Sequence, residues 1–272
     1  MKLTQIDLSI IIISYQSYDV INQNFSSLID SGYFRICIVD NASPDQSAKR
    51  LIKRFPHIHL IALEENIGYG CAANRALVKV TTPYALLLNP DITFEINALE
   101  NLVKYAKDSS DFAIMAPTTN TTSIGSNPLQ SVDWVSGSAI LFHMQNMSQI
   151  GFFDENIFLY FEETDLCKRV IQAGEKIILC SDVFFTHQSD QSSTPSKSVN
   201  KIKHWHYGWS RCYYFKKHRL NMKRRHPFLQ LIQYILKFCI AVNLQKKIKY
   251  FYRAQGAINY IIRFNKKPTC LN

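Results

Sequence analysis

Residues 8–14 read LSIIIIS, and this short run decides the fold class because five of its seven side chains are large and apolar. A continuous run of this kind is typical of a strand that is buried on both faces, as strands of parallel sheets are. Similar runs recur along the chain. We expect strands at 8–14, 35–40, 58–63, 84–88, 112–116, 134–142 and 176–180, and helices at about 18–30, 43–55, 68–80, 97–107 and 161–173. This alternation predicts an α/β fold with a mainly parallel central sheet flanked by helices.

The second expected helix carries a start signal of its own. Ser43 is a good N-cap residue, Pro44 suits the first helical position, and Gln46 completes a capping box. The sequence therefore predicts that Ser43 caps this helix and that Pro44 is its first residue.

Polar side chains follow the first four expected strands at the point where each strand ends. In chain order, these residues are Ser14 and Tyr15, Asp40 and Asn41, Glu64 to Asn66, and Asn89 to Asp91. In an open parallel sheet, ligands bind beyond the carboxyl ends of the strands. Four polar ends in succession therefore favour a binding site at this edge.

The stretch 84–92, YALLLNPDI, ends a buried strand with a carboxylate. Pro90 has no N–H group and a fixed φ, so it stops the strand and directs the next residue. A carboxylate held at Asp91 can bind a divalent cation that neutralises a diphosphate. The alternative is that Asp91 caps the helix that follows. His187, after an apolar run, is a candidate further ligand, although a lone histidine is more often structural.

The segment 66–74, NIGYGCAAN, places small residues at the start of a helix. Small side chains let a ligand approach the backbone, and a helix N-terminus favours phosphate. The segment is not GxGxxG and follows the third strand, which disfavours a dinucleotide-binding fold. Close packing between helix and sheet is the alternative explanation for Gly68 and Gly70.

A second acidic group lies at Glu162, Glu163 and Asp165. Three acids within four residues repel one another unless cations or hydrogen-bond donors compensate them. Aromatic residues at 158–161 precede the group, and a carboxylate beside aromatic walls can have its pKa raised toward the working range of a general base. The alternative is that the acids only favour the first turn of a helix through its dipole.

The charge distribution divides the chain at about residue 190. Residues 191–272 contain 18 of the 31 Lys and Arg residues and none of the 21 Asp and Glu residues. We therefore predict two parts with different roles, an α/β part at 1–190 and a basic, aromatic-rich helical region at 191–272. A surface this basic suits a polyanion, either an anionic membrane or nucleic acid.

The basic region contains an apolar, aromatic stretch at Phe228–Leu244, flanked by Lys223 to Arg225 and by Lys246 and Lys247. Its length and its internal lysine suit a helix in the membrane interface better than a membrane span. The hypothesis is peripheral attachment to the anionic inner leaflet of the cytoplasmic membrane. The alternatives are packing on the α/β part at 1–190 or on a second copy, as a homodimer.

Seven cysteines are scattered along the chain without a CxxC pair. This pattern favours reduced thiols in a cytoplasmic protein over a disulfide framework or a zinc site.

Three motifs, which follow one another along the chain in the same order as in the family, resemble those of family 2 glycosyltransferases of GT-A-type fold. The resemblance is closest to the rhamnosyltransferase-like members. The motifs are 132–139 (VDWVSGSA), 151–155 (GFFDE) and 158–169 (FLYFEETDLCKR), and they are similar to the family's W-x-x-G-A, G-x-F-D-E and Y-F-E-D-x-D-L-C-x-R runs. The resemblance covers roughly residues 8–190. It implies the GT-A-type nucleotide-sugar-binding fold.

The resemblance also implies roles for individual residues. Glu163 stands where the family has the Asp of its E-D pair, the catalytic base; Glu162 remains a competitor, and Asp165 supports the site. Asp91 occupies the place of a DxD motif whose first Asp is Asn89 here, and with His187 it would hold Mg²⁺ or Mn²⁺. The implied donor-binding residues are Ser14, Tyr15, Asp40, Asn41, Asn66, Gly68, Asn74, Asn89, Asp91, Gly137 and Ser138.

The activity implied is inverting transfer of rhamnose or a hexose, from dTDP-rhamnose or a UDP-hexose, to a saccharide acceptor. Our hypothesis is that this acceptor is linked to a lipid. The implied setting is bacterial cell-surface polysaccharide, O-antigen or lipopolysaccharide synthesis, with no nucleic-acid partner. Two other classes stay open. A sugar nucleotidyltransferase is disfavoured because residues 13–17 (ISYQS) lack Gly, Arg and Lys. A non-catalytic module that binds a polyanion or a membrane is disfavoured by Asp91, Glu163 and Asp165.

Overall fold

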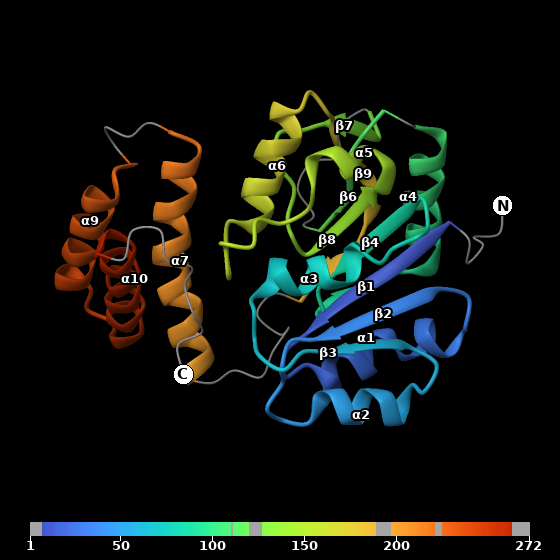
Figure 1. The fold of residues 1–272 in the computed structure, drawn as a ribbon, viewed down its shortest axis with the longest axis horizontal. Coiled ribbons are helices and arrows are strands. Elements are labelled where there is room, and N and C mark those ends of the chain that lie inside the picture. Colours follow the sequence, from blue (N-terminus) through green and yellow to red (C-terminus); the bar gives the residue numbers. More distant parts are fainter. Residues whose placement is uncertain (1–6, 110, 120–126, 189–196, 221–224, 263–272) are drawn as a thin grey trace.

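The computed structural model of the chain describes residues 7–109, 111–119, 127–188, 197–220 and 225–262. At its centre is an eight-stranded sheet in the order β3-β2-β1-β4-β8-β6-β9-β7 (Figure 1). The strands are β1 (Leu8–Ser14), β2 (Arg35–Asp40), β3 (His59–Ala62), β4 (Tyr84–Leu88), β6 (Ile114–Thr118), β7 (Leu129–Ser131), β8 (Ala139–His143) and β9 (Ile177–Phe184). β8 is antiparallel to β4 and β6, and β7 is antiparallel to β9, while the other pairs are parallel. The mainly parallel sheet is therefore confirmed as a mixed sheet with β7 and β8 reversed.

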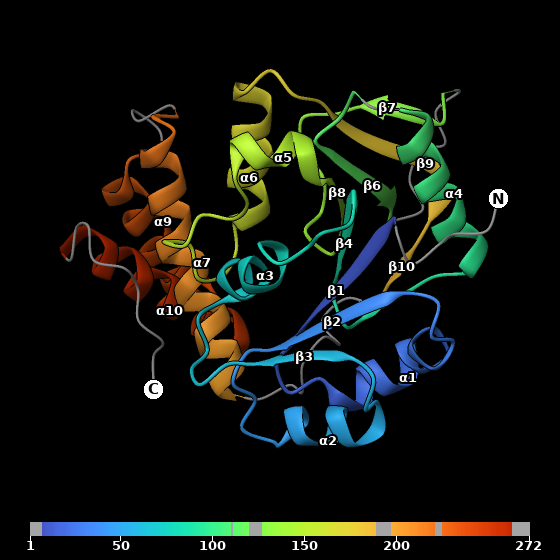
Figure 2. The same ribbon diagram turned by 45° about the vertical axis from the view of Figure 1, so that its right-hand side comes forward.

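Helices cover both faces of the sheet (Figure 2). They are α1 (Tyr18–Asp30), α2 (Ser47–Arg54), α3 (Tyr69–Leu77), α4 (Ile96–Asp108), α5 (Met144–Ile150) and α6 (Glu162–Gln172). The isoleucine run of β1 explains this two-sided burial. Ile10 and Ile12 belong to the core cluster that includes residues of α1 and α4, whereas Ile11 and Ile13 belong to the cluster that includes residues of α3 and α6. Successive side chains of a strand point to opposite faces, so one apolar run serves two cores.

The predicted start of the second helix is wrong. Helix α2 begins at Ser47, and Gln46 precedes it with a left-handed φ of 63°. Ser43 instead turns back to the end of β2, where its hydroxyl donates to Asp40 Oδ1 at 2.6 Å and its N–H donates to Asp40 Oδ2 at 2.9 Å. A strong carboxylate acceptor next to Ser43 therefore outcompetes the helix cap.

The strand expected at 134–142 is also shorter than predicted, because β8 begins only at Ala139. The residues before it form a loop instead of a strand. A two-stranded sheet of β5 (Ile92–Thr93) and β10 (Thr186–His187) and the short elements β7 and α5 were not expected from the sequence.

The described residues of the C-terminal region include the long helices α7 (Lys197–Lys217), α9 (Pro227–Ile240) and α10 (Leu244–Ile262). Helix α7 lies beside the α/β part, and α9 and α10 lie on the side of α7 that faces away from the sheet (Figures 1 and 2). Helices α7 and α10 cross closely, because a Cβ at Gly208 would lie 2.1 Å from the Arg253 carbonyl oxygen and one at Gly256 would lie 2.0 Å from that of Trp205. Within the described residues, no helix combines the length and the apolarity that crossing a membrane requires. The division of the chain at residue 190 stays a prediction.

Candidate active site

A cavity of about 360 Å³ lies at the carboxyl edge of β1, β2 and β4. Its walls also include the loop before β8, the start of α6 and the start of α7. Eleven residues expected at the site line this one cavity: Tyr15, Asn41, Asn66, Gly68, Asn89, Asp91, Gly137, Ser138, Glu162, Glu163 and His187. Residues from seven separate stretches of sequence therefore converge at the edge where a parallel sheet binds its ligands.

The other expected residues lie outside the cavity lining. Asp40 is buried and holds Ser43, as described above. Ser14 is fully buried, and its hydroxyl has no hydrogen-bond partner among the described residues. The Asn74 side chain donates to the Phe153 carbonyl at 2.9 Å and accepts from its N–H at 3.0 Å, so it fixes the GFFDE segment. Asp165 faces the C-terminal helices.

Asp91 is a buried carboxylate that accepts no hydrogen bond from the described residues. Its side chain is 1% exposed, and neither carboxylate oxygen has a hydrogen-bond partner within the described part of the chain. A buried carboxylate without donors is costly, and a cation is the usual compensation. The pairing of β10 with β5 brings His187 opposite Ile92, and its Nε2 lies 3.4 Å from Asp91 Oδ1.

Backbone contacts hold the turn that presents Asp91. The Asn89 N–H donates to the Ser138 carbonyl at 2.9 Å, and the Asn24 amide donates to the Pro90 carbonyl at 2.9 Å. The Asn89 side-chain oxygen is buried and, like Asp91, has no hydrogen-bond partner among the described residues. The two polar side chains around Pro90 are therefore prepared for a ligand. Asp91 and His187 are only two candidate ligands, and the described residues contain no cluster of three or more His, Cys, Asp or Glu suited to a metal.

The ends of β2 and β3 are joined by an amide pair. The Asn41 side chain donates to Asn66 Oδ1 at 2.9 Å and accepts from the Ile67 N–H at 3.0 Å. Gly68 follows with a φ of 89°, and a Cβ there would lie 2.2 Å from the Phe158 carbonyl oxygen. Only glycine permits this approach, so the small residues of the 66–74 segment serve close packing at this point.

Glu162 and Glu163 form a carboxylate pair at the start of α6 with different surroundings. Glu162 is 5% exposed, and its Oε2 has no hydrogen-bond partner within the described residues. Burial, aided by the charge of Glu163, raises the pKa of Glu162 well above its usual range. Burial also raises the pKa of Glu163, and a hydrogen bond from Thr164 opposes this rise. The negative charge of each glutamate makes ionisation of the other less favourable, and the more deeply buried Glu162 is the member more easily kept protonated.

Glu163 is the better positioned member of the pair. Its Oε1 accepts from the Thr164 hydroxyl at 3.2 Å, and Thr164 lies 3.3 Å from the indole nitrogen of Trp134, which is half-exposed. A Cβ at Gly137 would lie 3.3 Å from the Cβ of Glu163, so the VDWVSGSA loop packs directly against this side chain. Tyr69, which sequence reasoning missed, lines the cavity and donates to the Gly137 carbonyl at 3.1 Å.

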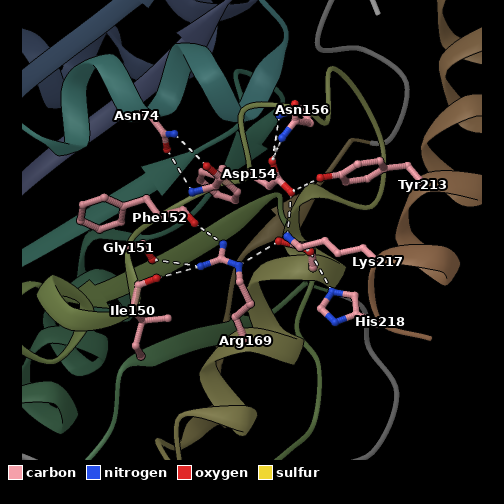
Figure 3. Close-up of polar contacts among 12 residues, drawn as sticks. Asn74, Ile150, Gly151, Phe152, Asp154, Asn156, Arg169, Tyr213, Lys217 and His218 are labelled. Atoms are coloured by element: carbon pink, nitrogen blue, oxygen red, sulfur yellow. Dashed lines mark hydrogen bonds and ion pairs between the residues drawn. The ribbon is translucent and has the colours of Figure 1, made fainter. Parts of the chain in front are cut away.

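Asp165 anchors the C-terminal region to the α/β part through Arg169, Lys217 and His218, and Figure 3 shows these three partners close together. Its carboxylate is 0% exposed and pairs with Arg169 Nε at 2.9 Å, Lys217 Nζ at 2.6 Å and His218 Nε2 at 2.8 Å. A buried carboxylate needs such compensation, and two of these partners come from the end of α7 or just beyond it. Asp165 thus joins α6 to α7.

The GFFDE motif takes part in the same anchor. Asp154 Oδ2 accepts from Lys217 Nζ at 2.7 Å and from the Tyr213 hydroxyl at 2.8 Å (Figure 3). Burial raises the pKa of Asp154, but hydrogen bonds from Lys217, Asn156 and Tyr213 outweigh this and hold it below its usual value. Two motifs of the α/β part therefore hold the C-terminal end of α7.

The middle of α7 packs on the loop before α6. The His206 ring stacks on Phe158 with centroids 4.1 Å apart, and the Ser210 hydroxyl donates to the Leu159 carbonyl at 2.9 Å. Burial lowers the pKa of His206 to about 3, so its ring is neutral. Nothing in the sequence of the basic region indicated this contact, because the partners lie more than 40 residues apart.

Comparisons with known proteins agree with this geometry. The sequence profile described as Glycosyl transferase family 2 matches residues 9–168. The chain is 29% identical over 226 residues to the low-salt glycan biosynthesis hexosyltransferase Agl10 of Haloferax volcanii, covering 72% of each chain. It is 24% identical over 188 residues to the N-acetylglucosaminyl-diphospho-decaprenol L-rhamnosyltransferase of Mycobacterium tuberculosis, covering 51% of this chain and 61% of that enzyme.

A solved structure shares the fold at lower sequence similarity. The mannosyltransferase PcManGT from Pyrobaculum calidifontis, solved in complex with GDP-Man and Mn²⁺, superposes with a TM-score of 0.61 at 13% identity. The match covers 95% of this chain and 88% of that one, so it includes the C-terminal region. The expected GT-A-type fold is confirmed.

Proposed function

The chain belongs to glycosyltransferase family 2, and on that premise we propose that it transfers a rhamnosyl or hexosyl residue from a nucleoside-diphosphate donor to a saccharide, with inversion. One observation carries the proposal: the buried carboxylate of Asp91, which accepts no hydrogen bond within the described residues, shares a cavity with the carboxylate pair of Glu162 and Glu163. A cation-binding group and a proton acceptor in one cavity are the two requirements of this reaction.

The residues present fit a divalent cation. Asp91 supplies two buried oxygens that accept no hydrogen bond from the part of the chain that the structure describes, and His187 Nε2 lies 3.4 Å from Oδ1. Carboxylate oxygen and neutral imidazole are both ligands of Mn²⁺-type sites, and carboxylate suits Mg²⁺. When bound there, the cation would stabilise the negative charge of the departing diphosphate. PcManGT, of the same fold, was solved with Mn²⁺.

We assign the base to Glu163 and keep Glu162 as its protonated neighbour. The stronger burial of Glu162 and the charge beside it favour the neutral acid there. The Thr164 hydroxyl stabilises the ionised form of Glu163. Asp165 is a positioning residue in this scheme, because its carboxylate is engaged by cations of α6 and α7.

The reaction then needs a single displacement. The Glu163 carboxylate takes the proton of an acceptor hydroxyl while that oxygen attacks the anomeric carbon. The bond from the anomeric carbon to the diphosphate oxygen breaks on the opposite face, so the configuration inverts. No covalent intermediate with the protein is required.

The proposed acceptor is a lipid-linked saccharide in bacterial cell-surface polysaccharide or O-antigen synthesis. The name of the mycobacterial relative specifies an acceptor joined through a diphosphate to decaprenol. Our first choice of donor is dTDP-rhamnose and our second a UDP-hexose. The family membership leaves the nucleotidyltransferase alternative without support.

Transfer with inversion is tested directly by product analysis. We expect the chain with Mn²⁺ to use dTDP-rhamnose or a UDP-hexose with a polyprenyl-diphosphate saccharide, and NMR of the product to show the anomeric configuration opposite to that of the donor. A product with the configuration of the donor would refute the proposal. So would a reaction that consumes a nucleoside triphosphate in place of glycosyl transfer.

We also propose that α9 and α10 attach the enzyme to the anionic inner face of the cytoplasmic membrane. Thirteen of the twenty large apolar residues that are exposed in the described structure lie between Phe228 and Ile262. On α9, the exposed residues Phe228, Ile232 and Ile235 recur at helical spacing and form one stripe. Lysines accompany this apolar surface, and no acidic residue occurs after Asp190.

Flotation with vesicles tests this attachment. We expect the full chain to float with phosphatidylglycerol vesicles, and the Ile232→Gln, Leu236→Gln double variant to float several-fold less, because both side chains are exposed and apolar. The control is Ile52→Gln with Val78→Gln, exposed apolar residues of the α/β part. Equal flotation of the two double variants would count against membrane attachment through α9. A dimer that depends on α9 and does not float would favour the homodimer instead.

A further inference from the structure

We propose that Lys203 of α7 binds a diphosphate in the active-site cavity, which makes the basic C-terminal region part of the catalytic machinery. This inference rests on the proposed function, since it assumes a substrate that carries a diphosphate.

The charges lining the cavity motivate the inference. Three carboxylates line it, from Asp91, Glu162 and Glu163, and Lys203 is the only Lys or Arg among the described lining residues. A diphosphate ester brings about two negative charges, and a third develops when the glycosidic bond breaks. One divalent cation beside Asp91 leaves part of this charge without compensation. A lysine in the wall is a compact cation suited to phosphate oxygens.

The position of Lys203 along α7 is fixed by contacts on the same helix. Val199 and Ile202 line the cavity with it, and His206 stacks on Phe158 three residues later. Lys203, His206 and Ser210 follow one another at intervals of three and four, so they share the face that meets the α/β part. Further along, Lys217 holds that face to Asp154 and Asp165. The ammonium group thus comes from a docked helix.

The opposite face of α7 is occupied by the helical bundle. Trp205, Trp209 and Cys212 form a buried cluster with residues of α9 and α10. This packing resists rotation of α7 about its axis and so keeps Lys203 directed toward the α/β part. One helix of the basic region can therefore supply a residue to the cavity while α9 and α10 cover its other face.

A diphosphate can reach the cavity from two sources, the nucleotide donor or the lipid-linked acceptor. Both present the same oxygens to an ammonium group, so the shared chemistry defines the site. The two sources are separated by measuring nucleotide affinity and acceptor KM independently.

The test compares Lys203→Met, which keeps the stem and removes the charge, with Lys203→Arg, which keeps the charge. Lys201→Met is the matched control, because Lys201 lies on the same helix with its Nζ 6.0 Å from the Tyr252 ring. Affinities for UDP, UMP, dTDP and dTMP are measured by calorimetry with Mn²⁺. The acceptor KM is measured with a polyprenyl-diphosphate saccharide and with the same saccharide on a phosphate-free alkyl chain.

If the donor diphosphate is the ligand, Lys203→Met weakens UDP or dTDP binding about 10- to 100-fold while the monophosphates change little. If the acceptor diphosphate is the ligand, the KM for the diphosphate-linked acceptor rises by a similar factor and that for the phosphate-free acceptor does not. In either arm Lys203→Arg recovers most of the loss and Lys201→Met matches the wild type.

The inference is overturned if Lys203→Met leaves both measurements unchanged, or if it only shifts the pH profile, as a mere charge partner of the glutamates would. These results differ from failure of the proposed function, in which the wild-type chain itself binds no nucleoside diphosphate and transfers no sugar.

Discussion

The Glu163→Gln variant loses about 10²- to 10⁴-fold in kcat, while its affinity for the nucleotide donor stays close to that of the wild type. Glutamine keeps the shape of the side chain and its contact with Thr164 but cannot accept the proton of the acceptor hydroxyl. The loss therefore appears in the chemical step. Steady-state kinetics with saturating donor and acceptor, together with donor binding by calorimetry, separate the two quantities.

The neighbouring variant Glu162→Gln is the matched control. If Glu162 carries a proton, as its deeper burial favours, glutamine replaces a neutral acid by a neutral amide and kcat falls less than about tenfold. The assignment of the base would be reversed if Glu162→Gln proved the inactive variant and Glu163→Gln the active one.

The dependence of kcat on pH also tests the assignment of Glu163 as the base. A base must be ionised to act, so kcat falls as the pH drops through the pKa of Glu163. Burial raises that pKa, so the acidic limb lies above the value of about 4.3 of an unperturbed glutamate. This limb disappears in Glu163→Gln, whose residual activity does not depend on that ionisation.

Much of the α/β part could be predicted from the sequence because its signals are local. The isoleucine run of β1 indicates a strand buried on both faces, and the residues that end β2 and β4 identify the binding edge of the sheet. A parallel sheet brings these ends together whatever the details of the helices, which is why Asn41, Asn66 and Asp91 share one cavity.

Long-range pairing explains what could not be predicted. Ser43 has the local features of a helix cap, but the carboxylate of Asp40 takes its hydroxyl. By sequence, Asp165 belongs to the acidic group at the start of α6, whereas its partners Lys217 and His218 lie more than 50 residues further along. Lys203 belongs to a basic segment whose composition indicates a surface, and only the docking of α7 places it in the cavity wall.

The other prediction with a large expected effect is the loss of metal-dependent nucleotide binding when Asp91 is replaced. The proposed use of a nucleotide-sugar donor depends on this residue. Removing a carboxylate that ligates the metal should cost at least as much as losing an outer-shell partner, about 10- to 100-fold in metal affinity. We therefore expect Asp91→Ala to lose the metal-dependent part of nucleotide binding. Glu65→Ala is the control, because Glu65 is an exposed acid at the same edge of the sheet, outside the cavity lining.

The most direct measurement is calorimetric titration of UDP and dTDP into the wild type, Asp91→Ala and Glu65→Ala, each with and without Mn²⁺. The proposed function predicts that wild type and Glu65→Ala bind one of the two nucleotides in a manner that requires the metal, and that Asp91→Ala does not; the preferred base then identifies the class of donor. Binding of neither nucleotide by the wild type under either condition, or equal metal-dependent binding by Asp91→Ala, would contradict it.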